Sequence, residues 1–205
     1  MNTKTKKIRM VICYTGTLLI SALFGSISIA QTDTDLTVFE ASENGNTEMV
    51  KAMVTANPAV MDLHDRYGKT PLHYAVCGNH ENLIAYFLEN GGSVMARDNR
   101  GWTALHYAAD NGNPDIVEML LSHHADVDAV DAMQWTPLHH AVMRGHTRVV
   151  LCLIKHGANV FAKTSSQTTA DAIALAHGQL AIKDYLAAQM IAQSEATHIN
   201  GYSHQ

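Results

Sequence analysis

A repeat of 33 residues is the feature that most constrains the fold. Three sets of identical residues recur at this interval, namely Asp65, Asp98 and Asp131; Thr70, Thr103, Thr136 and Thr169; and His73, His106 and His139. A fixed period of this length indicates stacked structural repeats. The apolar face of one unit is too small to form a core alone, so neighbouring units bury it against each other. The sequence therefore predicts a quasi-linear array.

Each unit is expected to fold as two short helices. Thr70 suits the N-cap of the first helix and Pro71 its first turn, where the missing N–H costs nothing. Apolar residues at helical spacing between Leu83 and Leu88 predict the second helix. Residues suited to left-handed backbone are expected to end both helices. These are Asn79, Gly112, Gly145 and Gly178 for the first helix, and Gly91 and Gly157 for the second.

Two residues depart from this pattern of left-handed positions. Gln134 occupies the turn position that Gly68 and Gly101 hold in the other units. His124 occupies the helix-ending position that Gly91 and Gly157 hold. Because residues with a Cβ seldom adopt positive φ, we expect a backbone cost at both departures.

The repeated pattern Asp-x-x-Gly-x-Thr-Pro-Leu-His, followed by a second helix and by "GANV" or "HADV", resembles the ankyrin repeat. The resemblance implies an all-α repeat solenoid of helix-turn-helix units joined by β-hairpin-like loops. Full repeats are expected at residues 65–97, 98–130 and 131–163. The flanking segments are expected to form an N-terminal capping repeat (31–64), a C-terminal capping repeat (164–190) and a flexible tail (191–205).

Residues 1–30 have the three-part pattern of a signal peptide. Four basic residues precede an apolar run, and Ser28 and Ala30 supply the small residues that a signal peptidase reads. We expect cleavage near Ala30 and a periplasmic or secreted chain that is no longer attached to a membrane. The alternative is an uncleaved anchor, because residues 10–30 are about as long as the roughly 20 residues that span a bilayer.

Cleavage would leave an acidic chain. It would remove 4 of the 14 Lys and Arg and none of the 19 Asp and Glu, for a formal charge of −9. This balance disfavours nucleic acid as a partner, and we expect a monomer. Cys77 and Cys152 would remain in repeats two units apart, too distant for a disulfide, so both are expected to be free thiols. Cys152 is interpreted as a small apolar filler.

Thirteen histidines raise the question of a metal site. The ankyrin resemblance implies that His73, His106 and His139 bridge neighbouring backbones, and His80 and His146 are interpreted in the same way. A different group, His123, His124 and His156, gathers at the ends of second helices in adjacent repeats, which suggests a loose zinc or copper site as an alternative. The sequence itself positions no carboxylate or thiolate that would complete this ligand set. We therefore predict no metal and no cofactor.

No motif for a nucleophile with its base, a metalloprotease or a phosphate loop is found. We therefore expect a non-catalytic module that binds another protein. The alternatives are a periplasmic metal- or haem-handling protein that uses the histidine cluster, and a secreted effector that binds a host protein. Exported bacterial ankyrin proteins that this chain resembles have been linked to catalases and to immunity against secreted toxins, so an envelope enzyme or a toxin is a candidate partner.

The resemblance places ligands on the hairpin tips and the inner short helices, which form a concave face. Trp102 and Trp135 are one period apart, so they are expected to project from neighbouring tips. The alternative is that each Trp packs the hairpin layer. Trp, Tyr and Arg dominate binding hot spots, and the basic residues of this face would suit an acidic patch on the partner. The candidate residues are Arg66, Tyr67, Lys69, Arg97, Asn99, Arg100, Trp102, Asp110, Met133, Trp135, Met143 and Arg144.

Overall fold

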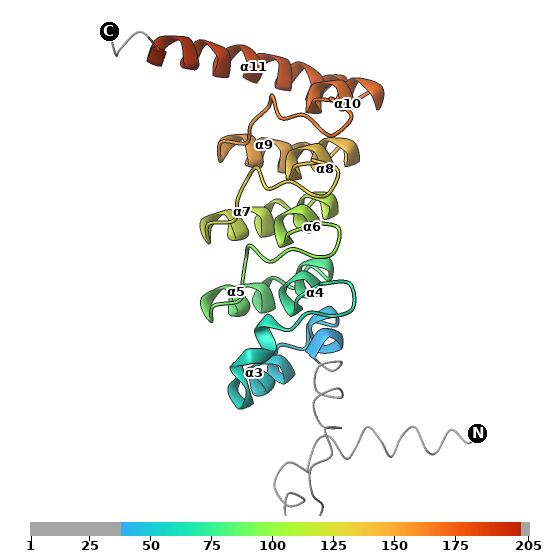
Figure 1. Cartoon of the computed structure of the whole chain (residues 1–205), viewed down its shortest axis with the longest axis vertical. Coiled ribbons are helices and arrows are strands. Elements are labelled where there is room, and N and C mark those ends of the chain that lie inside the picture. Colours follow the sequence, from blue (N-terminus) through green and yellow to red (C-terminus); the bar gives the residue numbers. More distant parts are fainter. Residues whose placement is uncertain (1–37, 202–205) are drawn as a thin grey trace, which may run out of the picture. The chain divides into compact units, whose positions relative to one another are not determined.

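Helices stack in successive pairs along the described part of the chain (Figure 1). The computed structural model describes residues 38–201, with side chains to residue 195, and these residues belong to one unit, Asp35–Gln205. The predicted signal peptide and the first residues of the predicted N-terminal cap lie outside the described residues. Within that range, no helix combines the length and apolar character that a membrane span requires.

Each repeat contributes one inner and one outer helix. The inner helices are α4 (Pro71–Cys77), α6 (Ala104–Asn111), α8 (Pro137–Arg144) and α10 (Ala170–Ala176). The outer helices are α5 (Glu81–Glu89), α7 (Pro114–Ser122), α9 (Thr147–Lys155) and α11 (Leu180–Gly201). The N-terminal end has helical residues 38–43, α3 (Thr47–Ala56) and the 3-10 helix η1 (Pro58–Asp62). Neighbouring inner helices pack on one another, as do α5, α7 and α9, which confirms the predicted all-α solenoid.

The repeated Thr and His residues begin the inner helices. In α6 the backbone N–H of Thr103 donates to Nδ1 of His106 over 3.1 Å, and Thr136 and His139 make the same contact in α8. These bonds satisfy a backbone donor at the start of each helix. The C-terminal cap differs, because Ala172 stands at the histidine position and the Thr169 hydroxyl donates instead to Asp171.

Histidine side chains also join neighbouring repeats. Nε2 of His106 lies 3.1 Å from the carbonyl oxygen of Trp135, and Nε2 of His139 lies 3.1 Å from that of Ala162. His80 and His146 reach back to the preceding repeat, at 2.7 and 2.9 Å from the carbonyl oxygens of Glu43 and Asp110 respectively. The predicted bridging role is confirmed for these four histidines. His73 differs, since its buried Nε2 has no hydrogen-bond partner among the described residues.

The core is built from the same positions in each repeat. Leu72, Leu105 and Leu138 are at most 1% exposed on the inner helices, and Leu83, Ile116 and Val149 are fully buried on the outer helices. In an array of repeats, burial of equivalent positions in every unit depends on the neighbouring units.

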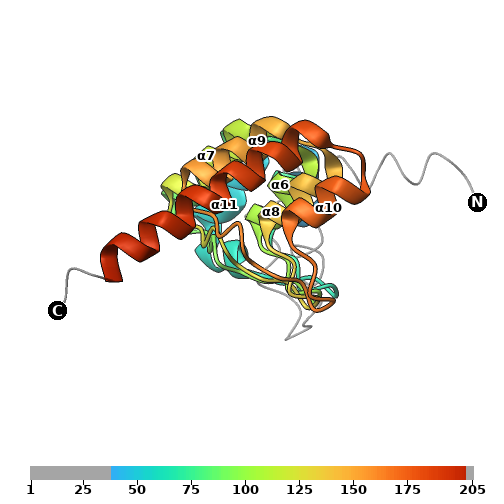
Figure 2. The ribbon, with the colours of Figure 1, turned by 90° about the horizontal axis from the view of Figure 1, so that it is seen from above.

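The loops before the inner helices are hairpin-like, as the resemblance implied. The backbone N–H of Asp98 donates to the carbonyl of Trp102, and that of Asp131 donates to the carbonyl of Trp135, each over 2.9 Å. Successive tips are also bonded together, since Ala132 N–H donates to the carbonyl of Arg100 over 2.9 Å. Figure 2 shows that these loops overlie one another and extend to one side of the helices.

Both departures from glycine adopt the left-handed conformation. His124 has φ of 65° and Gln134 has φ of 59°, close to the 80° of Gly101. The predicted positive φ is confirmed at both positions.

The C-terminal end differs from the prediction of a loose tail after residue 190. Helix α11 continues to Gly201, so that boundary falls inside a helix. The physical reason is local, because residues 180–200 contain no Gly or Pro and are rich in strong helix formers such as Ala, Leu and Gln.

Candidate protein-binding surface

An aspartate organises each of the three central hairpin tips. Oδ1 of Asp65 accepts hydrogen bonds from the backbone N–H groups of Tyr67 and Lys69, both over 2.8 Å. Asp98 and Asp131 make the equivalent pairs of bonds one and two periods later. These bonds hold each tip in one shape, which reduces the ordering cost when a tip binds a partner.

The first two tips together form an open pocket. Its volume is about 310 Å³, and it is lined by Tyr67, Lys69, Asp98, Asn99 and Arg100. The tips touch directly, because Asn99 N–H donates to the Tyr67 carbonyl over 2.8 Å. The structure thus brings together four of the predicted binding residues from segments one period apart.

The first tip presents an exposed cation and an exposed ring at Arg66 and Tyr67. The Tyr67 side chain is 52% exposed, and the guanidinium of Arg66 lies 4.7 Å from the centre of its ring. Arg66 is exposed as well. A cation held over an aromatic ring presents both charge and apolar area to solvent.

Arg100 lines the pocket and also contacts residues of its own repeat. Its guanidinium donates to the hydroxyl of Tyr107 over 2.7 Å and lies 4.3 Å from the ring centre of Trp102. The Tyr107 hydroxyl donates in turn to Oδ2 of Asp98 over 2.7 Å. Burial alone would raise the pKa of Asp98, but hydrogen bonds from Tyr107 and the backbone hold it below its usual value. The tip therefore carries a carboxylate that is charged and internally paired.

The two tryptophans do not project from the tips as expected. Trp102 is half-buried, and its ring centre lies 4.4 Å from that of His140 and 4.9 Å from that of Tyr107. Trp135 is half-buried as well, with its ring 5.2 Å from His140. Both tryptophans fill the space between the loops and the inner helices, as the packing alternative stated.

Sequence reasoning missed His140, which is buried at the centre of this aromatic cluster. Its Nε2 lies 3.3 Å from Oδ2 of Asp131. Tyr74 and Tyr107 occupy the same repeat position, and each donates its hydroxyl to the aspartate of its own tip over 2.7 Å. Burial lowers the pKa of His140, while Asp131 raises it in part. The 33-residue spacing of Tyr74, Tyr107 and His140 was the available signal.

The remaining predicted residues divide between the tips and the far ends of the inner helices. Arg144 in α8 makes a two-point ion pair with Asp110 in α6, at 2.7 and 3.1 Å, which ties two repeats together. Arg97 donates to the carbonyl oxygens of Gly101 and Val130. Met133 on the third tip and Met143 in α8 are 59% and 41% exposed.

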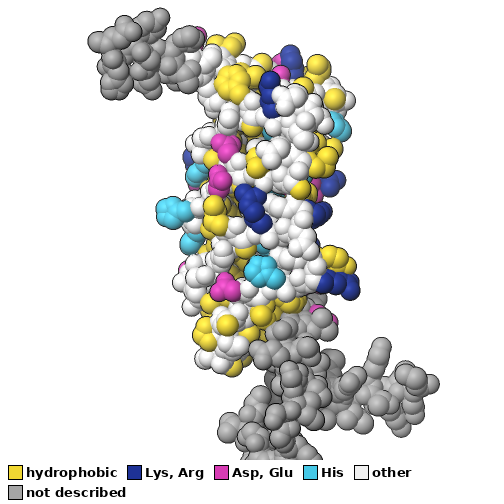
Figure 3. Space-filling model, in the orientation of Figure 1, with side chains coloured by type: hydrophobic (Ala, Val, Ile, Leu, Met, Phe, Trp, Pro, Cys, Tyr) yellow, Lys and Arg dark blue, Asp and Glu magenta, His cyan; other side chains and the backbone are white. Residues whose placement is uncertain are grey.

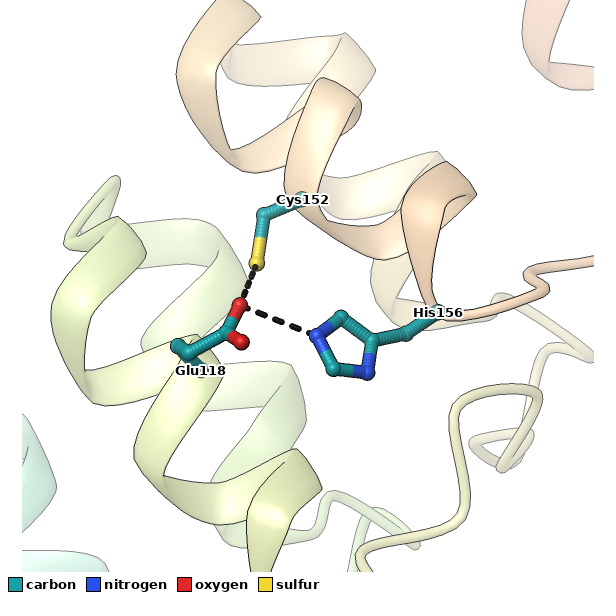
Figure 4. Close-up of side chains that lie close together, drawn as sticks. All are labelled: Glu118, Cys152 and His156. Carbon is teal, nitrogen blue, oxygen red and sulfur yellow. Dashed lines mark hydrogen bonds and ion pairs between the residues drawn. The ribbon is translucent and has the colours of Figure 1, made fainter.

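The predicted histidine cluster does not assemble as three histidines. Nδ1 of His123 lies 3.0 Å from the carbonyl oxygen of Met119 in its own helix, and His124 is exposed. His156 instead contacts Glu118, which also accepts a hydrogen bond from Cys152 (Figure 4). The sequence positioned no carboxylate or thiol beside the three histidines, and the structure places Glu118 and Cys152 close to His156. Cys152 is partly exposed and hydrogen-bonded, so it is more than an apolar filler.

Stacked helix pairs with hydrogen-bonded loops on one side define a repeat-built binding module. Family models described as "ankyrin repeats (3 copies)" and "ankyrin repeats (many copies)" match residues 38–131 and 111–154. Together these matches cover residues 38–154, more than half of the 205-residue chain. The chain therefore belongs to the ankyrin-repeat proteins, whose repeats typically act as non-catalytic modules that bind other proteins.

Proposed function

We propose that this chain is an exported, non-catalytic ankyrin-repeat protein that binds a partner protein through its first hairpin tips. The observation that carries the proposal is the exposed pair of Arg66 and Tyr67 beside the pocket lined by Arg100. Tyr and Arg are over-represented among residues that dominate binding energy. Because hydrogen bonds fix both neighbouring tips, the surface is preorganised for binding.

The charge of this surface favours an acidic patch on the partner. Lys and Arg side chains recur along the right-hand edge of the view in Figure 3, although the chain as a whole is acidic. Arg97, Arg100 and Arg144 also make bonds within the stack. The ammonium group of Lys69 lies 4.7 Å from the ring centre of Tyr107 in the next repeat. Arg66, which is exposed beside Tyr67, is therefore the cation that we assign first to the partner. Complementary charge of this kind increases the association rate and the specificity more than the affinity.

Export rests on the sequence of residues 1–30, which combine a basic start, an apolar run and small residues before the expected cleavage point. The partner would then be an envelope or secreted protein, with an envelope enzyme such as a catalase or a toxin as candidates. Cell fractionation with N-terminal sequencing tests this part. A chain that begins near Gln31 in the periplasm supports it, and a full-length chain held in the membrane contradicts it.

The binding surface is tested by capture from an envelope extract, followed by titration against the purified partner. Arg66→Glu is expected to weaken binding by about tenfold or more and to reduce its dependence on salt. Arg148→Glu is the matched control, since Arg148 is exposed on the outer helix α9. Equal loss in both variants, or no loss in either, would place the interface elsewhere.

A further inference from the structure

The outer helices of the second and third full repeats carry a cluster of metal-binding side chains. Cys152 and His156 are four residues apart, so the α9 backbone directs both to one face. Glu118 lies on α7, which packs against α9. Helix α9 and its C-terminal end thus supply a sulfur donor from Cys152 and a nitrogen donor from His156, and α7 supplies an oxygen donor from Glu118.

The donor atoms already lie close together (Figure 4). Oε2 of Glu118 is 3.2 Å from Sγ of Cys152 and 2.9 Å from Nε2 of His156, and all three donor atoms fall within 4.8 Å of one another. Ligands on a tetrahedral zinc ion are separated by roughly 3.3 to 3.7 Å, given bonds of about 2.0 to 2.3 Å. Small side-chain rotations would therefore be enough to surround an ion.

We propose that Glu118, Cys152 and His156 bind one Zn²⁺ ion, with water as the fourth ligand. A thiolate and an imidazole select zinc and related ions over Mg²⁺ or Ca²⁺, which prefer oxygen ligands alone. The site is open to solvent, because the side chains of Glu118 and His156 are 49% and 27% exposed. Water can therefore occupy the fourth position, as in zinc sites that keep an exchangeable ligand.

In the metal-free state the thiol of Cys152 keeps its proton. The Cys152 thiol donates to Glu118, and burial together with this bond raises the pKa of Cys152 to about 11. Binding of Zn²⁺ forms a bond from the ion to sulfur and breaks the S–H bond, and the proton leaves to solvent. Nε2 of His156 must likewise be free of hydrogen, so its proton resides on Nδ1 when the ion is bound.

The chain contains matched controls for two of the three proposed ligands, His156 and Cys152. His123 stands one period before His156 at the end of α7, but its ring bonds to the Met119 carbonyl of its own helix. Cys77 is the other thiol among the described residues, and it lies 4.0 Å from the ammonium group of Lys69. The third cysteine, Cys13, precedes the described residues. Cys13→Ser with Cys77→Ser therefore leaves Cys152 as the single thiol of the chain.

The test is titration of the tag-free, full-length chain, reduced and stripped of metal in mild detergent, with Co²⁺ as a spectroscopic substitute for Zn²⁺. We expect one ion per chain, a thiolate-to-cobalt absorption band, displacement by Zn²⁺ and release of the thiol proton. The chain with Cys152 as its single thiol and the His123→Ala variant should behave the same. Cys152→Ser and His156→Ala should each weaken binding at least about tenfold, because loss of even an outer-shell partner has that effect.

Three results would overturn the proposal. The first is the absence of saturable binding. The second is binding that is unchanged in Cys152→Ser and in His156→Ala, and the third is binding that is lost in His123→Ala instead. Circular dichroism melting of each metal-free variant shows whether it is folded. Glu118→Gln is a second test, since it keeps the shape of the side chain while removing the charged ligand. If any of the three overturning results is observed, Glu118, Cys152 and His156 act only as a hydrogen-bonded link between repeats.

Discussion

The indole Nε1 of Trp102 donates a hydrogen bond of 3.2 Å to Oδ2 of Asp131 in the next repeat. The same carboxylate oxygen lies 3.3 Å from Nε2 of His140, and Oδ1 of Asp131 accepts two backbone bonds that shape the third tip. Trp102 thus connects one tip to the residue that organises the next tip. In a repeat protein the interfaces between units contribute a large part of the stability.

We predict that Trp102→Ala lowers the free energy of unfolding by about 3 kcal/mol, because it removes a half-buried ring from the interface between two repeats. Trp102→Phe retains most of the ring but leaves Asp131 without this donor, and should cost about 1 to 2 kcal/mol. Urea unfolding measures both values. Met133→Ala is the control, since that side chain is 59% exposed. If Trp102→Ala is as mild as Met133→Ala, the indole does not couple the repeats.

The sequence was sufficient to predict features that depend on the local backbone or on the repeat itself. Examples are the N-caps at Thr103 and Thr136 and the left-handed residues His124 and Gln134. The bridging role of His106 was instead implied by the resemblance to the ankyrin repeat. The N-caps and the left-handed residues follow from local backbone rules and from the period.

Features that depend on side-chain packing between repeats could not be predicted. From the sequence, Trp102 could either project into solvent or pack on His140, and only the packed structure distinguishes these positions. Glu118 and Cys152 come from different repeats and have no shared position in the period, so no spacing rule predicts that they meet. The pairing of His140 with Asp131 is different, because the period does relate these residues to Tyr107 and Asp98, with a ring nitrogen in place of a tyrosine hydroxyl.

We predict that the fold loses stability in mild acid because of its buried histidines. Burial lowers the pKa of His73 and of His106 to about 4, compared with about 6.5 in an unfolded chain. Between these values the unfolded chain binds protons that the folded chain does not, so the free energy of unfolding falls as the pH decreases from about 6.5 to about 4. The slope is at most about 1.4 kcal/mol per pH unit for each histidine.

Urea unfolding across this pH range measures the slope. His106→Gln, which cannot take up a proton, should reduce the slope even though it lowers the stability near neutral pH. His123→Gln should leave the slope unchanged, because His123 is exposed at the end of α7. Parallel curves for His106→Gln and the parent chain would show that other groups cause the acid sensitivity.

We predict that Gln134→Gly stabilises the fold by several tenths of a kcal/mol, up to about 1 kcal/mol. Gln134 has φ of 59°, where a side chain causes strain that glycine avoids. The gain is partly offset, because glycine adds freedom to the unfolded chain. Ala132→Gly in the same turn is the control, since Ala132 is exposed and is not among the positive-φ residues of the described chain. It should only lower the melting temperature, and an equal decrease in both variants would contradict the strain argument.

The final prediction separates binding from stability. Tyr67→Ala removes a ring that is 52% exposed on the first tip, so it should change the free energy of unfolding by less than about 1 kcal/mol. If the ring is buried against the partner, the same change should weaken binding by about 2 kcal/mol or more. Leu105→Ala removes a fully buried side chain from α6 and should cost about 2 to 5 kcal/mol of stability through the cavity that it leaves.

Leu105 lies away from solvent, so Leu105→Ala should reduce binding only in proportion to the fraction of chains that it unfolds. Circular dichroism melting together with titration against the captured partner distinguishes the two effects. Tyr67→Phe refines the test, because it keeps the ring beside Arg66 while removing the hydroxyl, and it should bind nearly as well as the parent chain. A Tyr67→Ala variant that stays folded and binds normally would show that the partner contacts another surface.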